Sequence, residues 1–270
     1  MRSAIAQANA TLEADTVVFD PSIEGKTIVL ITGQIAVTNN LTIAATVSNR
    51  ITVSGNNSSR IFYFASGLTN QILNLKIIGG SASGAMGGAI INDHSFLTLS
   101  NVVIQGNSAQ RGGAIFNDGI FPSSANLVIL RSTLSGNSSA SFGGCIFNRG
   151  FAGSASVVIQ DSTFSGNSSG LFPGGVIFNQ GHGGGDAPVT ILNSTLSGNS
   201  GRSGSVIDSD AASSSLGTAV VTILHCTLAG NSGEGFAINN TGGVVMTGHT
   251  ILSHGSGRGI YTPSGTFGER

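Results

Sequence analysis

The chain has 270 residues, a net charge of −1, 9% charged residues and 40% hydrophobic residues. This length can form one sizeable domain. A chain so close to neutral and without a basic run lacks the electrostatic footprint of a nucleic-acid-binding protein, and no apolar run approaches the length of a transmembrane helix.

The first twelve residues are expected to cap the domain. Ile5 and Ala8 have the apolar spacing of a helix over residues 2–10, and Ser3 is its expected N-cap. Such a helix would cover the open edge of the first coil of a repeat structure. The alternative is that this segment is the tail of a removed leader.

Residues 13–80 are expected to form irregular first coils made of short strands. Runs of β-branched and aromatic residues alternate there with turn signals such as Asn39-Asn40 and Gly55-Asn56. The predicted strands are 16–19, 27–31, 34–37, 41–44, 51–53, 61–64 and a pair within 67–80.

Residues 81–242 carry a repeat of about 30 residues, which decides the architecture. Its clearest copy is Leu127–Gly150. One column of asparagines recurs at intervals of 30 or 32 residues: Asn107, Asn137, Asn167, Asn199 and Asn231. The second column comprises Asn92, Asn117, Asn148 and Asn179, with Asp208 and Asn239 as its predicted continuation. Gly-Gly pairs such as Gly112-Gly113 lie between the columns, where the chain needs positive φ or close approach.

Side chains within a repeat alternate with a period of two, which indicates strands. Leu127 and Ile129 would face inward together. A strand of three to five residues cannot bury its apolar face alone, but repeats stacked about 4.8 Å apart can. We therefore predict an all-β fold, a right-handed single-stranded parallel β-helix, in which asparagine amides bond from coil to coil. The alternative, an antiparallel sandwich of hairpins, does not predict asparagine at constant phase.

Residues 243–270 are expected to form degenerate terminal coils of the same single domain, and the chain is expected to be a segment of a longer protein. The connections that follow the second asparagine column are 119–126, 150–156, 181–188 and 208–218. We expect them to protrude on one side, which in solenoids is often the binding face. Cys145 and Cys226 are expected to be buried free thiols about three coils apart, too far for a disulfide.

The pattern Gly-Gly-Ala-Ile at Gly112–Ile115 and Gly87–Ile90, combined with Phe-x-x-Asn at Phe164–Asn167, resembles the repeat of polymorphic outer-membrane proteins. It is similar more broadly to bacterial right-handed parallel β-helix repeat proteins. The resemblance implies a non-enzymatic, adhesin-like passenger that is secreted or exposed at the cell surface. It carries over no catalytic residue. Surface glycans or host-matrix molecules are the expected partners of a monomer without cofactor or metal, and this chain shows no export signal.

The alternative is a carbohydrate-active enzyme or an inactive relative of one, because polysaccharide lyases and pectin-type glycoside hydrolases also use the β-helix. Such enzymes need carboxylates about 5–9 Å apart, or a base near calcium-binding carboxylates. The positions after the second asparagine column supply the candidates Asp93, Asp118 and Arg149. The enzyme interpretation predicts that Asp93 and Asp118 face one cleft. The structural interpretation is charge pairing between coils.

Two further motifs give weaker catalytic signals. Gly181-His182-Gly183 resembles a motif of polygalacturonases, but the rest of their pattern is absent. Asp208 and Asp210 form the nearest acidic pair, in a Ser-rich stretch that we expect to be a loop. The remaining candidates for metal ligation lack the required spacing and are expected to be solvated turn residues: His94, His249 and His254.

Two outward-facing files complete the sequence pattern. The first is polar, and Arg131 and Asp161 are expected to pair within it. Its members are Asn101, Arg131, Asp161, Asn193 and His225. The second is a file of threonines that favours, as a third interpretation, an ice- or crystal-binding face: Thr133, Thr163, Thr195 and Thr227.

Overall fold

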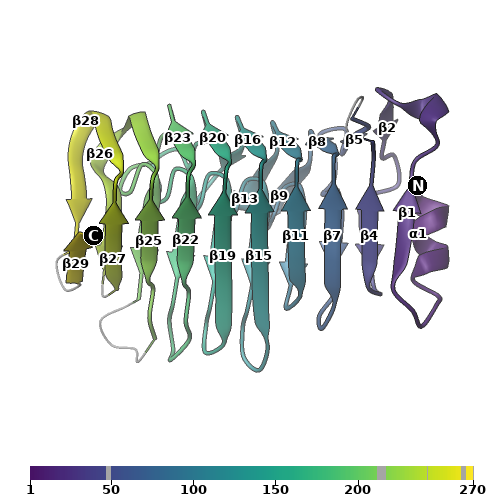
Figure 1. The fold of residues 1–270 in the computed structure, drawn as a ribbon, viewed down its shortest axis with the longest axis horizontal. Helices are drawn as coiled ribbons and strands as arrows, with labels where there is room; N and C mark the ends of the chain where they lie inside the picture. Colours follow the sequence, from purple (N-terminus) through teal and green to yellow (C-terminus); the bar gives the residue numbers. More distant parts are fainter. Residues whose placement is uncertain (47–49, 212–216, 242, 263–265, 270) are drawn as a thin grey trace.

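Parallel strand pairing organises the whole molecule. The computed structural model describes residues 1–46, 50–211, 217–241, 243–262 and 266–269. The chain winds into a solenoid in which each strand pairs in parallel with its equivalent in the next coil (Figure 1). The predicted parallel β-helix is confirmed, and the antiparallel sandwich is wrong.

Three groups of strands form the faces of the solenoid. The first is a ten-stranded sheet. Its strands are β1 (Asp15–Val18), β4 (Leu41–Ala44), β7 (Thr69–Leu73), β11 (Phe96–Ser100), β15 (Ser124–Leu130), β19 (Ser154–Gln160), β22 (Val189–Leu192), β25 (Val221–Leu224), β27 (Val244–Gly248) and β29 (Thr266–Glu269).

The second and third faces belong to one sheet, because the long strand β26 passes from one to the other. The second face has β2 (Thr27–Val29), β5 (Thr52–Ser54), β8 (Lys76–Ile78), β12 (Val103–Gln105), β16 (Thr133–Ser135), β20 (Thr163–Ser165), β23 (Thr195–Ser197) and β26 (Thr227–Thr241). The third face has β3 (Ile35–Val37), β6 (Phe62–Phe64), β10 (Ile90–Asp93), β14 (Ile115–Asp118), β18 (Ile146–Arg149), β21 (Ile177–Gln180) and β24 (Ile207–Asp210). β28 (Ile251–Tyr261) pairs with β26, and a small separate sheet comprises β9 (Ser81–Met86), β13 (Ser108–Arg111) and β17 (Ser138–Ser139).

The core is a set of columns of like residues. Leu127 and Ile129 are fully buried on β15, whereas Val128 between them is half-buried on the outer face. Leu134 of β16 lies opposite Phe164 of β20, and both are buried. One hydrophobic cluster runs the length of the solenoid as a result. Cys145 and Cys226 are buried free thiols, as predicted.

The N-terminal cap is the helix α1 (Arg2–Ala8), and a short 3-10 helix follows at Pro21–Ile23. Ile5 and Ala8 of α1 are buried against the first coil. The N-cap prediction is wrong, because the helix begins at Arg2 and places Ser3 inside it, and Met1 in the cap position makes no side-chain bond. Arg2 instead fixes the helix by donating to the backbone carbonyl of Gln34 on the neighbouring coil.

The first asparagine ladder is continuous from Asn107 to Asn231. Each side-chain Nδ2 donates to the Oδ1 of the next asparagine at 2.9–3.0 Å. The same Oδ1 accepts the backbone N–H of the preceding asparagine, as Asn137 does from Asn107 at 3.0 Å. Asn137 Nδ2 also donates to the carbonyl of Ile104 at 3.1 Å. Every polar atom of a fully buried amide is therefore satisfied by the neighbouring coils.

The second ladder runs from Asn92 through Asn117 and Asn148 to Asn179, with Nδ2 to Oδ1 distances of 2.6–2.8 Å. Its predicted continuation is wrong. Ser209 accepts from Asn179 at 3.0 Å, and Asn240 lies opposite Ser209. Ile207 must face the core opposite Ile177, so Ser209 and not Asp208 takes the inward ladder position. Asp208 and Asn239 each precede a ladder residue and face outward.

Each Gly-Gly pair lies between the two ladders, and its two glycines are needed for different reasons. Gly112 has a φ of +60°, which side chains rarely adopt. A Cβ on Gly113 would lie 2.2 Å from the carbonyl oxygen of Gly144 in the next coil, so no side chain fits there.

The connections that follow β14, β18 and β21 lead into the ten-stranded sheet and line up along one edge of the solenoid, the lower edge in Figure 1, as the sequence predicts. Of the fourth predicted connection, 208–218, residues 212–216 lie outside the described residues. Within the described residues, no helix is long and apolar enough to cross a membrane.

We expect Asn137→Leu to lower the free energy of unfolding by about 3–5 kcal/mol, because it leaves several buried partners unpaired at about 1–3 kcal/mol each. Chemical denaturation would measure the loss. The matched control is Asn126→Leu, at a half-buried outward position of β15, where the side chain accepts one hydrogen bond, from Ser156 Oγ at 2.6 Å, and the expected loss is about 1 kcal/mol. Equal stability of the two variants would contradict a stabilising ladder.

Candidate functional site

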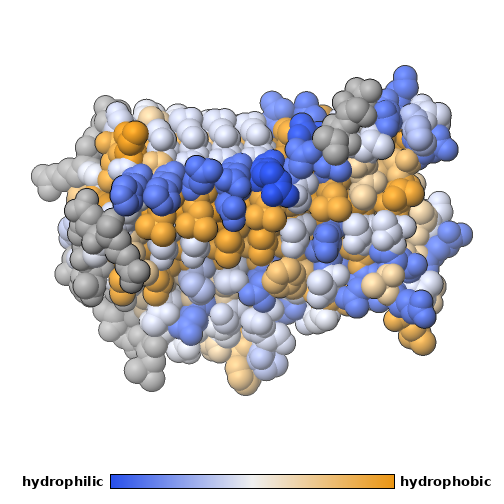
Figure 2. All heavy atoms as spheres, viewed as in Figure 1, coloured by the Kyte–Doolittle hydropathy of each residue, from blue (hydrophilic) through white to orange (hydrophobic). Residues whose placement is uncertain are grey.

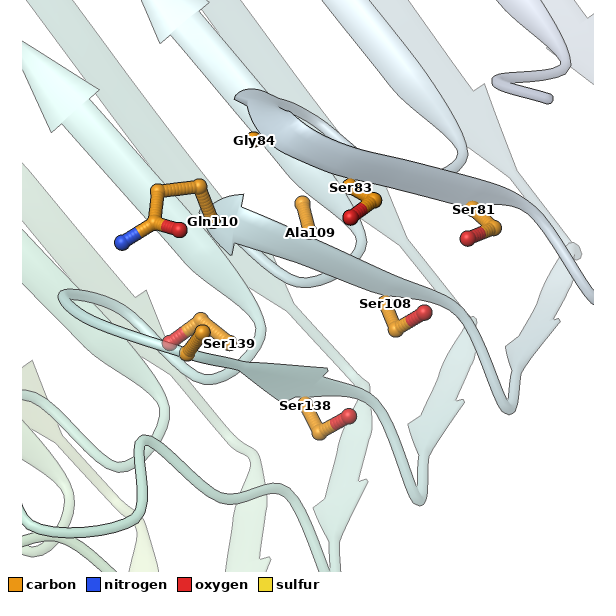
Figure 3. Close-up of a pocket in the computed structure, with 9 residues that line it drawn as sticks. Ser81, Ser83, Gly84, Ser108, Ala109, Gln110, Ser138 and Ser139 are labelled. Carbon is orange, nitrogen blue, oxygen red and sulfur yellow. The ribbon is translucent and has the colours of Figure 1, made fainter. Parts of the chain in front are cut away.

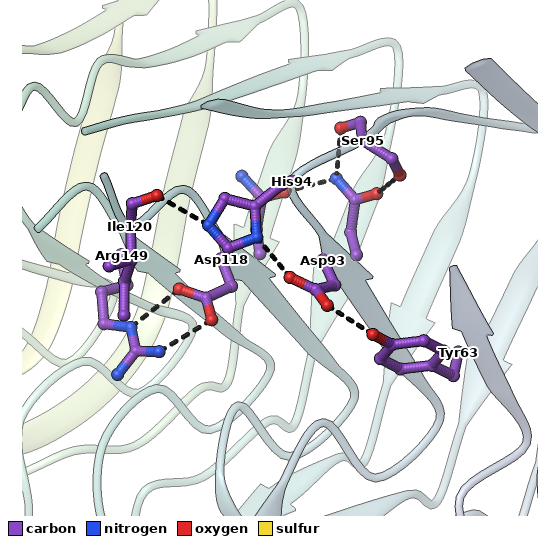
Figure 4. A network of polar contacts seen from close by, with 9 residues as sticks. Tyr63, Asp93, His94, Ser95, Asp118, Ile120 and Arg149 are labelled. Atoms are coloured by element: carbon purple, nitrogen blue, oxygen red, sulfur yellow. Dashed lines mark hydrogen bonds and ion pairs between the residues drawn. The ribbon is translucent and has the colours of Figure 1, made fainter. Parts of the chain in front are cut away.

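The residues proposed from the sequence lie together on the third face, as their register predicts. Asp93, Asp118 and Arg149 occupy equivalent positions of consecutive coils. Arg149 donates to Asp118 through Nε at 2.9 Å and Nη2 at 2.7 Å (Figure 4). Its guanidinium carbon lies 4.8 Å from the ring centre of Phe116. Asp118 is thus already held by a bidentate ion pair.

Asp93 is held in the same network from the other side. It accepts a hydrogen bond from the Tyr63 hydroxyl and contacts His94 Nδ1 (Figure 4). The bond to Asp93 raises the pKa of Tyr63 to about 12. All the carboxyl groups of this network have close partners, which is the arrangement that charge pairing between coils predicts. A catalytic role for the three residues stays a prediction.

The histidines in turns differ from one another. His94 has a left-handed φ of 50°, as a turn residue does, but its side chain is only 18% exposed, and its Nε2 lies 2.7 Å from the carbonyl oxygen of Ile120. His249 is exposed in a left-handed turn, as predicted, and stacks on His225 at 5.1 Å. The side chain of His254 lies outside the described residues.

The polar file that contains Arg131 and Asp161 occupies left-handed turns at the ends of the strands of the ten-stranded sheet. On this side of the molecule, a hydrophilic row lies above an apolar band (Figure 2). The predicted pairing of Arg131 with Asp161 is wrong. Arg131 leans toward the preceding coil and donates to Ser100 Oγ at 3.0 Å, whereas Asp161 accepts from Asn193 of the following coil at 2.6 Å.

A groove of about 430 Å³ opens on the outer side of the third face, toward the C-terminal coils. Strand alternation builds its floor, because Phe147, Phe178 and Asp208 occupy one outward column of consecutive strands. The next outward column places Gln180 and Asp210 along one side. The lining of the opposite side comes from the segments that precede the strands: Arg111, Phe142, Pro173 and Ser203.

The aromatic end of the groove is a packed cluster. Phe147 lies edge-on between Phe116 and Phe178, with both ring-centre distances at 5.3 Å. Phe142 covers Phe178 at 4.6 Å and remains half-buried. This end offers the apolar surface on which ligand pockets usually rely.

The acidic end contains two carboxylates on one strand. Asp208 and Asp210 lie two positions apart on β24, and both face outward. Their Cα atoms are therefore about 6.6 Å apart along the strand. Asp208 is 5% exposed and accepts from Ser203 Oγ at 2.9 Å and Asn239 Nδ2 at 2.8 Å. Burial raises the pKa of Asp208 to about 6, and the charge of Asp210 adds to the effect while the two hydrogen bonds oppose it.

His182 completes the acidic end. Its Nε2 lies 3.1 Å from Asp210 Oδ2, which is an ion-pair distance, although the angle is not that of a hydrogen bond. Its Nδ1 lies 3.3 Å from the side-chain Nε2 of Gln180. Because an amide nitrogen can only donate, Nδ1 accepts this contact, which leaves a ring proton on Nε2, near Asp210 but not directed at its carboxylate.

The sequence contained these residues as two separate weak signals. It gave no reason to join His182 to Asp210, and it placed Asp208 and Asp210 in a loop, whereas they lie on the strand β24. Matching Ile207 to Ile177 in the repeat would have shown that both aspartates face outward. The sequence did place Asn239 beside Asp208, but as a ladder residue, whereas in the structure Asn239 Nδ2 donates to the Asp208 carboxylate on the outer face.

A second hollow, of about 410 Å³, lies over β9, β13 and β17. The hydroxyl groups of Ser81, Ser108 and Ser138 form a file there, one from each coil (Figure 3). Its lining contains no titratable side chain, so this hollow offers hydrogen bonds without acid–base chemistry. The threonine file on the second face has the predicted register, and ice or crystal binding stays a prediction. Within the described part of the chain, no group of three or more metal-binding side chains is arranged around a common point.

Comparisons with known proteins bear on the fold. No family model matches the chain, and no curated protein matches it. The solved structure of an alginate lyase from Paenibacillus sp. str. FPU-7 is similar over 100% of this chain and 96% of that chain, with a TM-score of 0.52 and 14% identity. Geobacillus virus E2 ORF18 is similar with a TM-score of 0.51 and 12% identity, and this chain spans 57% of its length. At these identities the likeness shows the β-helix fold alone.

The raised pKa of Asp208 predicts a pH-dependent effect on stability. Protonated Asp208 favours the folded state, so this contribution is complete below the unfolded pKa of 3.8 and is lost as the pH rises through about 6. The variant Asp208→Asn lacks this titration. The free energy of unfolding of Asp208→Asn minus that of the unmodified chain should therefore rise by up to about 3 kcal/mol from pH 4 to pH 7.5. Denaturation at both pH values would measure it.

The control is Asp161→Asn, which changes an exposed carboxylate. Its stability difference from the unmodified chain should shift by less than about 0.5 kcal/mol over the same range. A parallel shift in both variants would contradict the assignment to the burial of Asp208.

Proposed function

We propose that this protein is a carbohydrate-active β-helix enzyme that hydrolyses a glycosidic bond in the groove on the third face. The observation that carries the proposal is the pair Asp208 and Asp210, which face one groove from a single strand with Asp208 partly protonated near neutral pH. The alginate lyase likeness supports a fold that suits polysaccharide chains, and function must come from the site itself.

The two carboxyl groups have distinct environments, as glycoside hydrolysis requires. Asp208, with a pKa near 6, donates its proton to the leaving glycosidic oxygen as the bond to the anomeric carbon breaks. Asp210 takes a proton from a water molecule, whose oxygen bonds to the anomeric carbon from the opposite side. Inverting glycosidases leave about 6.5–9.5 Å between their carboxyl groups for this water. Two outward side chains whose Cα atoms are about 6.6 Å apart can reach this separation, so the pair suits an inverting reaction.

The surrounding residues position these two groups. Ser203 and Asn239 hold Asp208 by hydrogen bonds, and His182 lies beside Asp210 at an ion-pair distance. Phe142 offers an apolar surface for the C–H face of a sugar ring next to the acidic end. A lyase needs a base beside a neutralised carboxylate on the substrate, and two aspartates at the same end favour hydrolysis over elimination.

The cellular role follows the substrate. A polysaccharide substrate favours a secreted or cell-surface location for this protein, as the resemblance to outer-membrane repeat proteins also implies. The adhesin-like role rests on that resemblance alone. Surface glycans remain the proposed partners under both interpretations.

The test is a polysaccharide panel in which both new reducing ends and new unsaturated ends are measured. We expect reducing ends alone, and Asp208→Asn or Asp210→Asn should lower kcat by about a hundredfold to ten-thousandfold. Activity should fall as the pH rises above about 6, because Asp208 then loses its proton.

Asp118→Asn separates this site from the network around Arg149. It should keep its activity if Asp208 and Asp210 are the catalytic pair. Unsaturated ends would contradict hydrolysis. Loss of activity in Asp118→Asn with full activity in Asp208→Asn would place the catalytic site in the network around Arg149. Retention of a glycan without any product would favour the non-enzymatic passenger.

A further inference from the structure

Arg111 stands at the end of the groove opposite the two aspartates. Its guanidinium carbon lies 5.6 Å from the ring centre of Phe142 and 5.9 Å from that of Phe147. Two other arginines form ion pairs with carboxylates, Arg149 with Asp118 and Arg202 with Glu234. Between described residues, Arg111 has neither an ion pair nor a side-chain hydrogen bond, although it is half-buried.

A half-buried arginine without an anionic partner in the chain is available to a ligand. The aromatic rings stabilise the cation through its face, and the N–H donors of its edge are open to water or to a ligand, because none of its nitrogens is among the buried unpaired atoms of the described residues. Carboxylate and sulfate groups match this fork with two parallel charge-assisted bonds. Because Arg111 lines the groove, its N–H donors are available to an anionic group of a ligand bound there.

The distance from Arg111 to the aspartates follows from the coils. The residues that line this side belong to consecutive coils, because Gly112 N donates to Phe142 O and Gly143 N to Pro173 O. Gly174 N then donates to Ser203 O. Arg111 is thus three coils from Ser203, about 14 Å along the axis. The groove has a cation at one end and two carboxylates at the other.

We infer that the groove binds an acidic heteropolysaccharide, with an anionic sugar at Arg111 and an uncharged sugar at Asp208 and Asp210. This inference rests on the proposed function, since it names the substrate class of the same groove. A polymer with a carboxylate on every sugar would place a like charge beside the two aspartates, which is unfavourable in a half-buried site. A neutral polymer would leave Arg111 without a partner.

A purely structural role for Arg111 makes a different prediction. If the guanidinium only packs over Phe142 and Phe147, its replacement should change stability and leave ligand preference as it was. The test must therefore compare ligands that differ only in charge, on variants whose folding is checked.

The experiment measures binding and turnover of matched polymers by the full chain. The probes are hyaluronan and glucuronoxylan, in which uronates accompany neutral sugars, each beside its carboxyl-reduced form. Polygalacturonate represents the uniformly charged polymer, and dextran sulfate beside dextran tests sulfate as the source of the anion. The variants are Arg111→Gln, Arg111→Lys and Asp208→Asn, each checked by thermal unfolding.

The expected result is that at least one uronate heteropolymer binds more tightly than its carboxyl-reduced form and than polygalacturonate. Arg111→Gln should weaken that binding about tenfold to a hundredfold and leave the reduced form unaffected. Arg111→Lys should retain part of the preference, because the charge remains while the fork is lost. Added salt should weaken binding to the unmodified chain more than to Arg111→Gln.

The inference fails if Arg111→Gln leaves the preference unchanged, or if reduced polymers or polygalacturonate bind best. It also fails if the anionic probe that binds through Arg111 is dextran sulfate alone, since this polymer carries charge throughout. Hydrolysis that requires Asp208 but not Arg111 would uphold the proposed function and reject the inference. Arg111-dependent binding of a heteropolymer without hydrolysis would reject the reaction and uphold the recognition of the acidic chain.

Discussion

The parallel stacking of equivalent strands is the constraint on which the rest of this structure depends. Each coil is too short to bury its own apolar side chains, and it becomes stable only when its backbone and its inward residues meet the same residues of the next coil. This requirement fixes the register along the whole molecule. The asparagine ladders reinforce it, because an amide bonds its neighbour only when the coils are aligned. A slip of one residue would turn every inward side chain outward.

The same constraint converts sequence columns into surface columns. Once Ile207 is fixed inward, Asp208 and Asp210 must both face outward on β24. Successive coils then bring Phe147, Phe178 and Asp208 into one file at a spacing of about 4.8 Å. The groove is therefore made by residues that are about 30 positions apart in the sequence, and no single repeat contains it.

Two clusters of ionisable residues on the third face illustrate different uses of charge. Around Asp93 and Asp118 every carboxylate has close partners, since Arg149 neutralises Asp118 while Tyr63 and His94 contact Asp93. At Asp208 burial dominates, and the carboxyl group has only neutral hydrogen-bond donors, so its pKa rises. A group poised to exchange a proton near neutral pH is suited to general acid catalysis, whereas a neutralised ion pair is suited to joining coils.

The sequence by itself determined the architecture. The constant phase of the asparagines, the two-residue alternation and the Gly-Gly pairs are local requirements that repeat, so the parallel β-helix, the buried cysteines and the capping helix could all be predicted. The end of the second ladder was assigned wrongly, because chemical likeness favoured Asp208 where core packing required Ser209. Only the tertiary structure decided the site. His182 lies beside Asp210, and Arg111 lies over Phe142 without an ion pair to any described residue, because side chains from different coils converge according to their length and direction. Those properties are not visible in the spacing of a repeat.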